Sequence, residues 1–188
     1  MTNSERNYII IVEASGFMSN NLIITISRER GAGGTKIAKS VAKILEIPYY
    51  SKEAFLIKGE DGHRKLMNSG EIKKIIAQNS PCVTLGRCAD YVMADKNLHY
   101  FSVFIKAPHK TRKVNLKNEY DLDSYSVDRV FEKEDDMKKH FEKYTGMKWG
   151  SSRSYDLVLN TGKMRRDDAI KTICEIALGL MNKKVEID

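Results

Sequence analysis

Residues 24–38 read ITISRERGAGGTKIA, and this stretch decides the expected fold. It continues an apolar run that begins at Leu22, and a short run rich in β-branched residues is typical of a strand buried on both faces of a parallel sheet. Glycines follow at positions 31, 33 and 34, and apolar residues then recur at helical spacing between positions 36 and 46. The stretch therefore predicts a strand, a glycine loop and a helix in succession.

A loop of this kind can bind phosphate, because glycines let backbone amides converge on an anion and a helix N-terminus adds partial positive charge. The usual pattern, G-x-x-x-x-G-K-[ST], is met only in part. With Gly33 as its second glycine, Thr35 supplies the hydroxyl, but Gly34 stands at the lysine and Arg28 at the first glycine. The alternative pattern G-x-G-x-x-G fails at Lys36.

A glycine turn that only joins a strand to a helix is the alternative to a phosphate loop. The cations of the stretch favour phosphate binding: they are Arg28, Arg30 and Lys36. A guanidinium grips phosphate oxygens at least as well as an ammonium, so we expect Arg28 to replace the missing lysine.

Short apolar runs alternate with helical patterns along the rest of the chain. Strands are expected at 47–50, 82–85, 100–105 and 156–159, and helices at 71–78, 128–144 and 167–181. This alternation predicts a layered α/β fold with a mostly parallel sheet. The helix at 128–144 is highly charged and has few core positions, and the polar segment 58–64 is expected to be a loop.

The composition limits the class of partner and the compartment. A net charge of +7 favours an anionic partner: nucleotide, nucleic acid or acidic lipid. No signature of a nucleic-acid-binding module is present, so we do not expect the protein to bind nucleic acid. Three scattered cysteines argue against zinc and disulfides and suggest the cytoplasm, and no apolar run could span a membrane. The run at 8–12 is expected to be an edge strand or an appended segment, so we divide the chain into an N-terminal extension, 1–21, and one domain, 22–188.

Four segments resemble the cytidylate kinase-like proteins, a bacterial branch of the nucleoside monophosphate kinases. They are SRERGAGG with IPYYSKE (27–34 and 47–53), PCVTLGRCADY (81–91), FIKAP with Arg112 (104–108 and 112), and YTGMKWG with YDLVLNT (144–150 and 155–161). The resemblance extends from about 22 to 178 and implies a P-loop NTPase-like three-layer α/β fold with a helical lid excursion at about 118–148. This branch lacks the usual loop lysine as a rule.

The resemblance implies ATP-dependent phosphoryl transfer, assisted by Mg²⁺, to a nucleoside monophosphate, with cytidylate as the first candidate acceptor. The ATP-binding residues it implies are Arg28, Gly31, Ala32, Gly33, Gly34, Thr35 and Lys36. Thr35 would hold Mg²⁺ through its hydroxyl, with helix capping as a compatible alternative. The substrate-binding residues it implies are Arg87, Asp90, Arg112 and Asp156.

Each of these substrate residues also has a structural reading. Arg87 and Asp90 could form a surface ion pair, Arg112 could lie on a solvated helix face, and Asp156 could cap the start of a strand. Cys88 is expected to be a small packing residue rather than a nucleophile, because no histidine partner is suggested by spacing. Trp149 could stack on a base, although packing is the more frequent fate of such a side chain.

The chain departs from the family pattern at the acceptor and in the lid. Ser51 stands where the family has an aspartate, and Met137 stands where its lid has an arginine. Lys138 and Lys139 are the catalytic cations expected to take over from that arginine. These departures keep a second hypothesis open: a non-catalytic nucleotide-binding sensor or partner-binding protein on the same fold.

Overall fold

A central sheet of five parallel strands organises the chain in the computed structural model, which describes residues 21–59 and 63–182. The strands are β1 (Ile23–Arg28), β2 (Tyr49–Tyr50), β5 (Cys82–Leu85), β6 (Tyr100–Lys106) and β7 (Leu157–Asn160), in the order β2-β5-β1-β6-β7. The predicted α/β fold with a parallel sheet is confirmed. The expected run at 8–12 lies outside the described residues.

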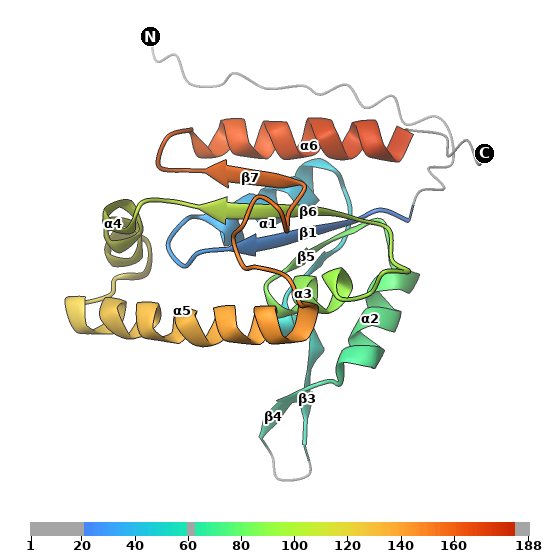
Figure 1. Cartoon of the computed structure of the whole chain (residues 1–188), viewed down its shortest axis with the longest axis horizontal. Helices are drawn as coiled ribbons and strands as arrows, with labels where there is room; N and C mark the ends of the chain where they lie inside the picture. The colour runs from blue at the N-terminus through green and yellow to red at the C-terminus, as the bar shows by residue number, and fades with distance from the viewer. Residues whose placement is uncertain (1–20, 60–62, 183–188) are drawn as a thin grey trace.

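Helices cover both faces of this sheet, so the fold has three layers (Figure 1). On one face α1 (Gly34–Ile44) and α6 (Arg166–Asn182) pack on Ile24 and Ile26 of β1. On the other face α2 (Ser69–Gln78) and α3 (Arg87–Met93) pack with Ile23. The hydrophobic pattern does not predict α3, because all its residues after Arg87 are buried and it has no polar stripe.

The carboxyl ends of the strands meet at one edge, where ligands bind in open α/β sheets. Arg28 pairs with Ile105 and Ile26 with Leu85, so β1, β5 and β6 end side by side. The glycine loop follows β1 at this edge, and α4 (His109–Tyr120) follows β6 there (Figure 1). The candidate residues of the glycine loop are therefore placed at the ligand-binding edge.

The charged helix of the lid excursion is α5 (Ser124–Thr145). It begins four residues earlier than expected because the Asp123 side chain accepts a hydrogen bond from the Ser126 N–H and caps it, and it ends at Gly146 in the left-handed conformation. Its buried residues, at intervals of seven positions, are Val127, Glu134 and Phe141. The expectation of few core positions is confirmed, and one of them is a glutamate.

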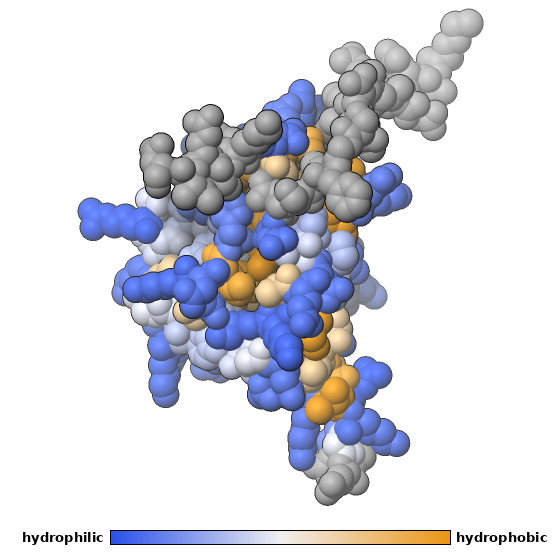
Figure 2. Space-filling model, turned by 90° about the vertical axis from the view of Figure 1, so that its right-hand side faces the viewer, coloured by the Kyte–Doolittle hydropathy of each residue, from blue (hydrophilic) through white to orange (hydrophobic). Residues whose placement is uncertain are grey.

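A small antiparallel hairpin projects from the body beside α2 (Figure 1). Its strands are β3 (Leu56–Lys58) and β4 (Arg64–Leu66), preceded by a short 3₁₀ helix, Lys52–Phe55. Segment 58–64 was expected to be a loop. This prediction is wrong for its two end residues, Lys58 and Arg64, which pair with each other in the hairpin. Ile57 is half-exposed on this hairpin, and Figure 2 shows hydrophobic surface on the same projecting part. No helix within 21–59 and 63–182 is long and apolar enough to cross a membrane.

Candidate functional site

The glycine loop between β1 and α1 takes a conformation that requires glycine. Gly31 and Gly33 both have a φ of 81°, in the left-handed region. Gly33 is the N-cap residue of α1 and offers no side chain to the first amides of the helix. These N–H groups are therefore free to bind an anion, with the positive end of the helix dipole behind them.

Thr35 is the second residue of α1, so the reading of Thr35 as the N-cap is wrong. Its side chain has no hydrogen-bond partner in the part of the chain that the structure describes, and it lines the cavity at the loop. The hydroxyl is thus left for a ligand.

The side chain of Arg28, at the end of β1, explains why position 34 is a glycine and not the usual lysine. A Cβ at position 34 would lie 2.6 Å from the Cβ of Arg28, and one at position 86 would lie 2.7 Å from its Nη1. The Arg28 side chain therefore passes over Gly34 and ends against Gly86, which follows β5. A lysine at position 34 would occupy the path of this arginine.

Arg28 and Arg30 bring two guanidinium groups close together at this edge. Burial lowers the pKa of Arg28, and the charge of Arg30 lowers it further. In residues 21–59 and 63–182 neither guanidinium has a hydrogen bond or an ion pair, and the Arg30 Nε is buried. Desolvated cations that repel each other are costly unless an anion joins them.

A cavity of about 640 Å³ opens between the glycine loop and the lid, within the size range of small-ligand sites. The loop lines one side of it. The segment expected to face the acceptor contributes Tyr49, Ser51 and Glu53. An apolar wall comes from the lid excursion and the sheet edge: Leu85, Leu116, Tyr120, Leu122 and Val130.

Glu53 supplies a carboxylate to the cavity lining two residues after Ser51. The Ser51 hydroxyl donates to Glu53 Oε2 at 2.5 Å. This hydrogen bond is the largest cause that lowers the pKa of Glu53, which keeps the carboxylate ionised. An ionised carboxylate therefore lies beside Ser51 in the same cavity.

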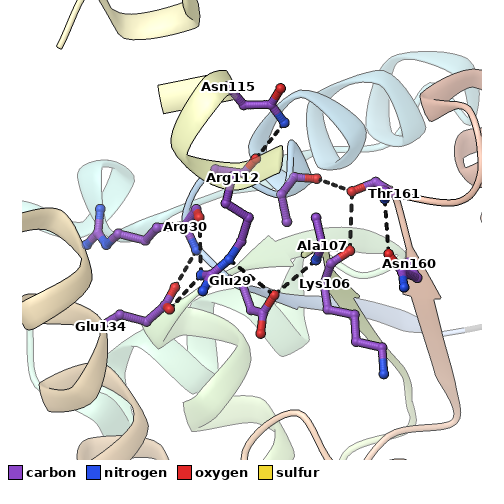
Figure 3. A network of polar contacts seen from close by, with 12 residues as sticks. Glu29, Arg30, Lys106, Ala107, Arg112, Asn115, Glu134, Asn160 and Thr161 are labelled. Atoms are coloured by element: carbon purple, nitrogen blue, oxygen red, sulfur yellow. Dashed lines mark hydrogen bonds and ion pairs between the residues drawn. The ribbon is translucent and has the colours of Figure 1, made fainter. Parts of the chain in front are cut away.

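Arg112 lies in a buried ion network behind the loop (Figure 3). Its Nη1 donates to Glu134 Oε2 at 2.6 Å, and its Nε lies 3.5 Å from Glu29 Oε2. The same Glu29 oxygen accepts the Ala107 N–H at 3.0 Å. Arg112 is thus only 8% exposed and committed to two carboxylates, so the solvated-face reading is wrong and its guanidinium is already paired.

This network fixes the backbone of the loop residue by residue. The Arg30 N–H donates to Glu134 Oε1 at 2.5 Å, and the Arg30 carbonyl accepts from Arg112 at 3.3 Å. The next two carbonyls are held as well: Gly31 O accepts from the Asn115 amide at 2.8 Å, and Ala32 O accepts from the Thr161 hydroxyl at 2.8 Å. Three separate parts of the chain therefore hold the loop in shape.

The remaining predicted ATP-site and lid cations lie outside the cavity lining. Lys36 pairs with Glu119 at 3.0 Å on the outer side of α1, and Glu119 also binds Arg166 at 2.6 Å. Lys138 and Lys139 are exposed on α5 and do not line the cavity. The structure does not place these three lysines in the cavity lining.

Two predicted substrate residues lie on α3, next to the cavity. Asp90 is buried, and burial is the largest cause that raises its pKa, with His140 and Arg28 opposing. Its Oδ2 lies 3.8 Å from Nδ1 of His140 on α5, whereas Arg87 is exposed. Asp90 therefore joins α3 to the lid helix.

Asp156 lies far from the loop, at the amino end of the sheet. Its carboxylate accepts the Ser102 N–H at 2.8 Å and the Ser102 hydroxyl at 2.7 Å. Ser102 lies near the start of β6, and Asp156 immediately precedes β7. This placement fits the reading of Asp156 as a cap at the start of a strand.

The packing expectations for Cys88 and Trp149 agree with the structure. Cys88 has no exposed surface, and burial raises the pKa of its thiol to about 12, which excludes a thiolate nucleophile at neutral pH. The Trp149 ring meets Phe104 edge-on at 5.0 Å in a small core cluster.

Sequence reasoning missed Glu29, Glu134, Asn115 and Thr161. One signal for Glu134 was present, because it lies on the stripe that carries Val127 and Phe141 at seven-residue spacing. A carboxylate on a buried stripe needs a cation, and this requirement points to a buried partner such as Arg112.

The cavity contains a donor that suits Mg²⁺. This ion binds through few protein oxygens and takes the rest from phosphates and water. The Thr35 hydroxyl lines the cavity and could supply one of them. No cluster of three or more metal-ligating side chains occurs in residues 21–59 and 63–182, so a dedicated protein cage is not found there.

Comparisons with known proteins agree with this architecture. The sequence profile described as the cytidylate kinase-like family matches residues 23–58 and 60–163. No curated protein matches the chain.

Three solved structures illustrate the similarity. An uncharacterized protein from Eubacterium ventriosum is 29% identical, with a TM-score of 0.68, over 82% of this chain and 97% of the other. Shikimate kinase from Acinetobacter baumannii, in complex with shikimate, is 12% identical, with a TM-score of 0.53, over 89% and 98%. The YorR protein of Bacillus subtilis, in complex with phosphorylated GDP, is 14% identical, with a TM-score of 0.52, over 86% and 99%.

The last two structures share this fold, which confirms the predicted P-loop NTPase-like fold class. The family profile covers most of the chain, in agreement with the resemblance of the four motifs. By its sequence and its fold, this chain belongs to the cytidylate kinase-like family.

Proposed function

We propose that this protein transfers the γ-phosphoryl group of ATP to the phosphate of a nucleoside monophosphate, with cytidylate as the acceptor. One observation carries the proposal: two guanidinium groups, Arg28 and Arg30, lie without partners in the described chain beside a glycine loop whose helix amides are free. Such a site suits a polyphosphate and has no evident structural purpose without one.

In the proposed reaction an oxygen of the acceptor phosphate forms a bond to the γ-phosphorus. The bond between that phosphorus and the β–γ bridging oxygen breaks, and ADP leaves with the electron pair. The loop amides and Arg28 bind the donor phosphates and orient them for this in-line displacement. Mg²⁺, held near Thr35, would neutralise charge on the donor phosphates when bound. The wall formed by Leu116, Tyr120 and Leu122 would shield the phosphates from water.

The test is coupled ADP release with ATP, Mg²⁺ and a panel of nucleoside monophosphates. Turnover is expected with cytidylate above the other acceptors. Arg28→Met should lower kcat/KM by about 1,000-fold, since it removes a buried cation from the transferring group, while the melting temperature changes little. Arg153→Met, a loss of an exposed charge elsewhere, is the matched control. Absence of turnover with every acceptor, in folded protein, would reject the proposal.

A second function is favoured by the state of Arg112. Its guanidinium is already paired with Glu29 and Glu134, and α5 brings no arginine to the cavity. A nucleotide-binding sensor without catalysis would need only the loop. It predicts that nucleotide raises the melting temperature while product analysis detects no new diphosphate.

A further inference from the structure

The guanidinium that the lid helix lacks has a counterpart in the loop itself. Met137 stands where the family's lid carries an arginine, and the lysines beside it are exposed and lie away from the cavity. Arg30 lines the cavity and has a buried Nε without a partner.

The backbone of Arg30 is held from both sides by side chains of other elements. Its N–H donates to Glu134 on α5 and its carbonyl accepts from Arg112 on α4. Figure 3 shows the side chain of Arg30 extending away from Arg112, and within the described chain no hydrogen bond or ion pair joins its guanidinium to either residue. The backbone is thus fixed while the guanidinium is left free of the network.

The direction of that side chain brings two like charges together. The charge of Arg30 is near enough to Arg28 to lower the pKa of Arg28. Two guanidinium groups at close range repel each other, and both carry five N–H donors that need acceptors. A tetrahedral phosphate group with several oxygens satisfies both at once.

We propose that Arg30 binds the terminal phosphate of the donor together with Arg28. We also propose that Glu134 of the lid helix positions Arg30 by accepting the hydrogen bond from the Arg30 backbone N–H. The lid therefore acts on the phosphate through the loop instead of contributing an arginine of its own. This inference rests on the proposed function for the identity of the donor, but its binding step does not require turnover.

Calorimetric titration of the full chain with inorganic tripolyphosphate tests the role of Arg30, because this probe has no base and no acceptor. Arg30→Met is expected to weaken binding by about tenfold, as is usual for the loss of a charge-assisted contact, and Arg30→Gln serves if the first variant does not fold. Arg129→Met, an exposed arginine of the same lid helix, should bind like the parent. Parent-like affinity in Arg30→Met or Arg30→Gln would overturn the assignment.

A double-variant cycle tests Glu134. Glu134→Ala should weaken tripolyphosphate binding in the parent but have little further effect once Arg30 is methionine, because both changes remove the same contact. Glu134→Gln keeps an oxygen for the Arg30 N–H and should restore most of the affinity. If the double variant instead loses affinity by the product of the two single-variant factors, Glu134 acts independently of Arg30. Tight tripolyphosphate binding without any turnover would instead reject the kinase function and leave this inference intact.

Discussion

The two ends of the cavity are built in different ways. At the donor end, side chains from α4, α5 and the segment after β7 reach the glycine loop across separations of 82 to 129 residues. At the acceptor end, the main side-chain contact is the bond from Ser51 to Glu53, two residues apart. Long-range hydrogen bonds hold the glycine loop, whereas the segment proposed to bind the acceptor is held by a local one.

The largest expected effect on stability comes from removing the central cation of the donor end. Arg112→Met leaves the buried Glu134 and the partly buried Glu29 without their shared partner, which should cost about 3–5 kcal/mol of the free energy of unfolding. Urea denaturation measures it. Lys113→Met, a neighbour that pairs with Asp128 on the surface, should cost less than about 1 kcal/mol. Equal losses in the two variants would show that the network does not hold the donor end.

A glycine pair separates backbone strain from crowding. Gly31→Ala places a Cβ 2.6 Å from the Arg112 carbonyl oxygen at a φ of 81°, so we expect a loss of about 3 kcal/mol from strain and displacement together. Gly146→Ala has a similar φ of 71° but meets no atom within 4 Å, and should lose about 1 kcal/mol. Thermal unfolding of both variants gives the comparison. A smaller loss at position 31 than at position 146 would contradict the close packing of loop and α4.

The acceptor end should respond in kinetics and hardly in stability. Glu53→Gln is expected to raise the KM of the acceptor by about tenfold through loss of a charge-assisted hydrogen bond, with the KM of ATP unchanged. Glu175→Gln, on the far helix α6, should leave both constants unchanged. An effect of Glu53→Gln on ATP alone would place this carboxylate at the donor end.

The smallest effect concerns pH and lies at the junction of α3 and the lid. Burial raises the pKa of Asp90, so the folded chain holds this proton more tightly than the unfolded chain does. Stability should therefore fall as the pH rises from the ordinary aspartate range through the raised pKa. Asp90→Asn removes the titration and should gain stability relative to the parent over that window. Unfolding free energies measured from about pH 4 to about pH 7 test it, and a parent that gains on the variant would reverse the assigned direction.

The sequence predicted what depends on local pattern. The strand at 82–85 matches β5 residue for residue, and the glycine loop lies where its φ requirements demand it. Arg28 was also placed correctly at the loop, because it adjoins the glycines in sequence. The reason for the absent lysine was not predictable, since Gly86 lies far along the chain and only strand pairing brings it to Arg28.

Residues whose roles depend on partners were predicted less well. Arg112 was expected to face the phosphates, but Glu134 and Glu29 reach it first, and neither contact follows from spacing. Asp156 is a second example. The sequence predicted that it lies at the start of a strand, but it did not show at which end of the sheet that strand begins. Charged side chains have several acceptable partners, and the packing of the helices decides among them.

The seven-residue spacing on α5 makes the length of this helix matter more than its surface. Seven residues are about two turns, so Val127, Glu134 and Phe141 form one line along the buried side of the helix. Inserting a single residue between Val127 and Glu134 would rotate the carboxylate by about 100° about the axis relative to the first anchor. Exposed charges on the helix can therefore be exchanged freely. A one-residue insertion or deletion between positions 127 and 134 would instead turn Glu134 away from the Arg30 N–H and break the contact between the lid helix and the glycine loop.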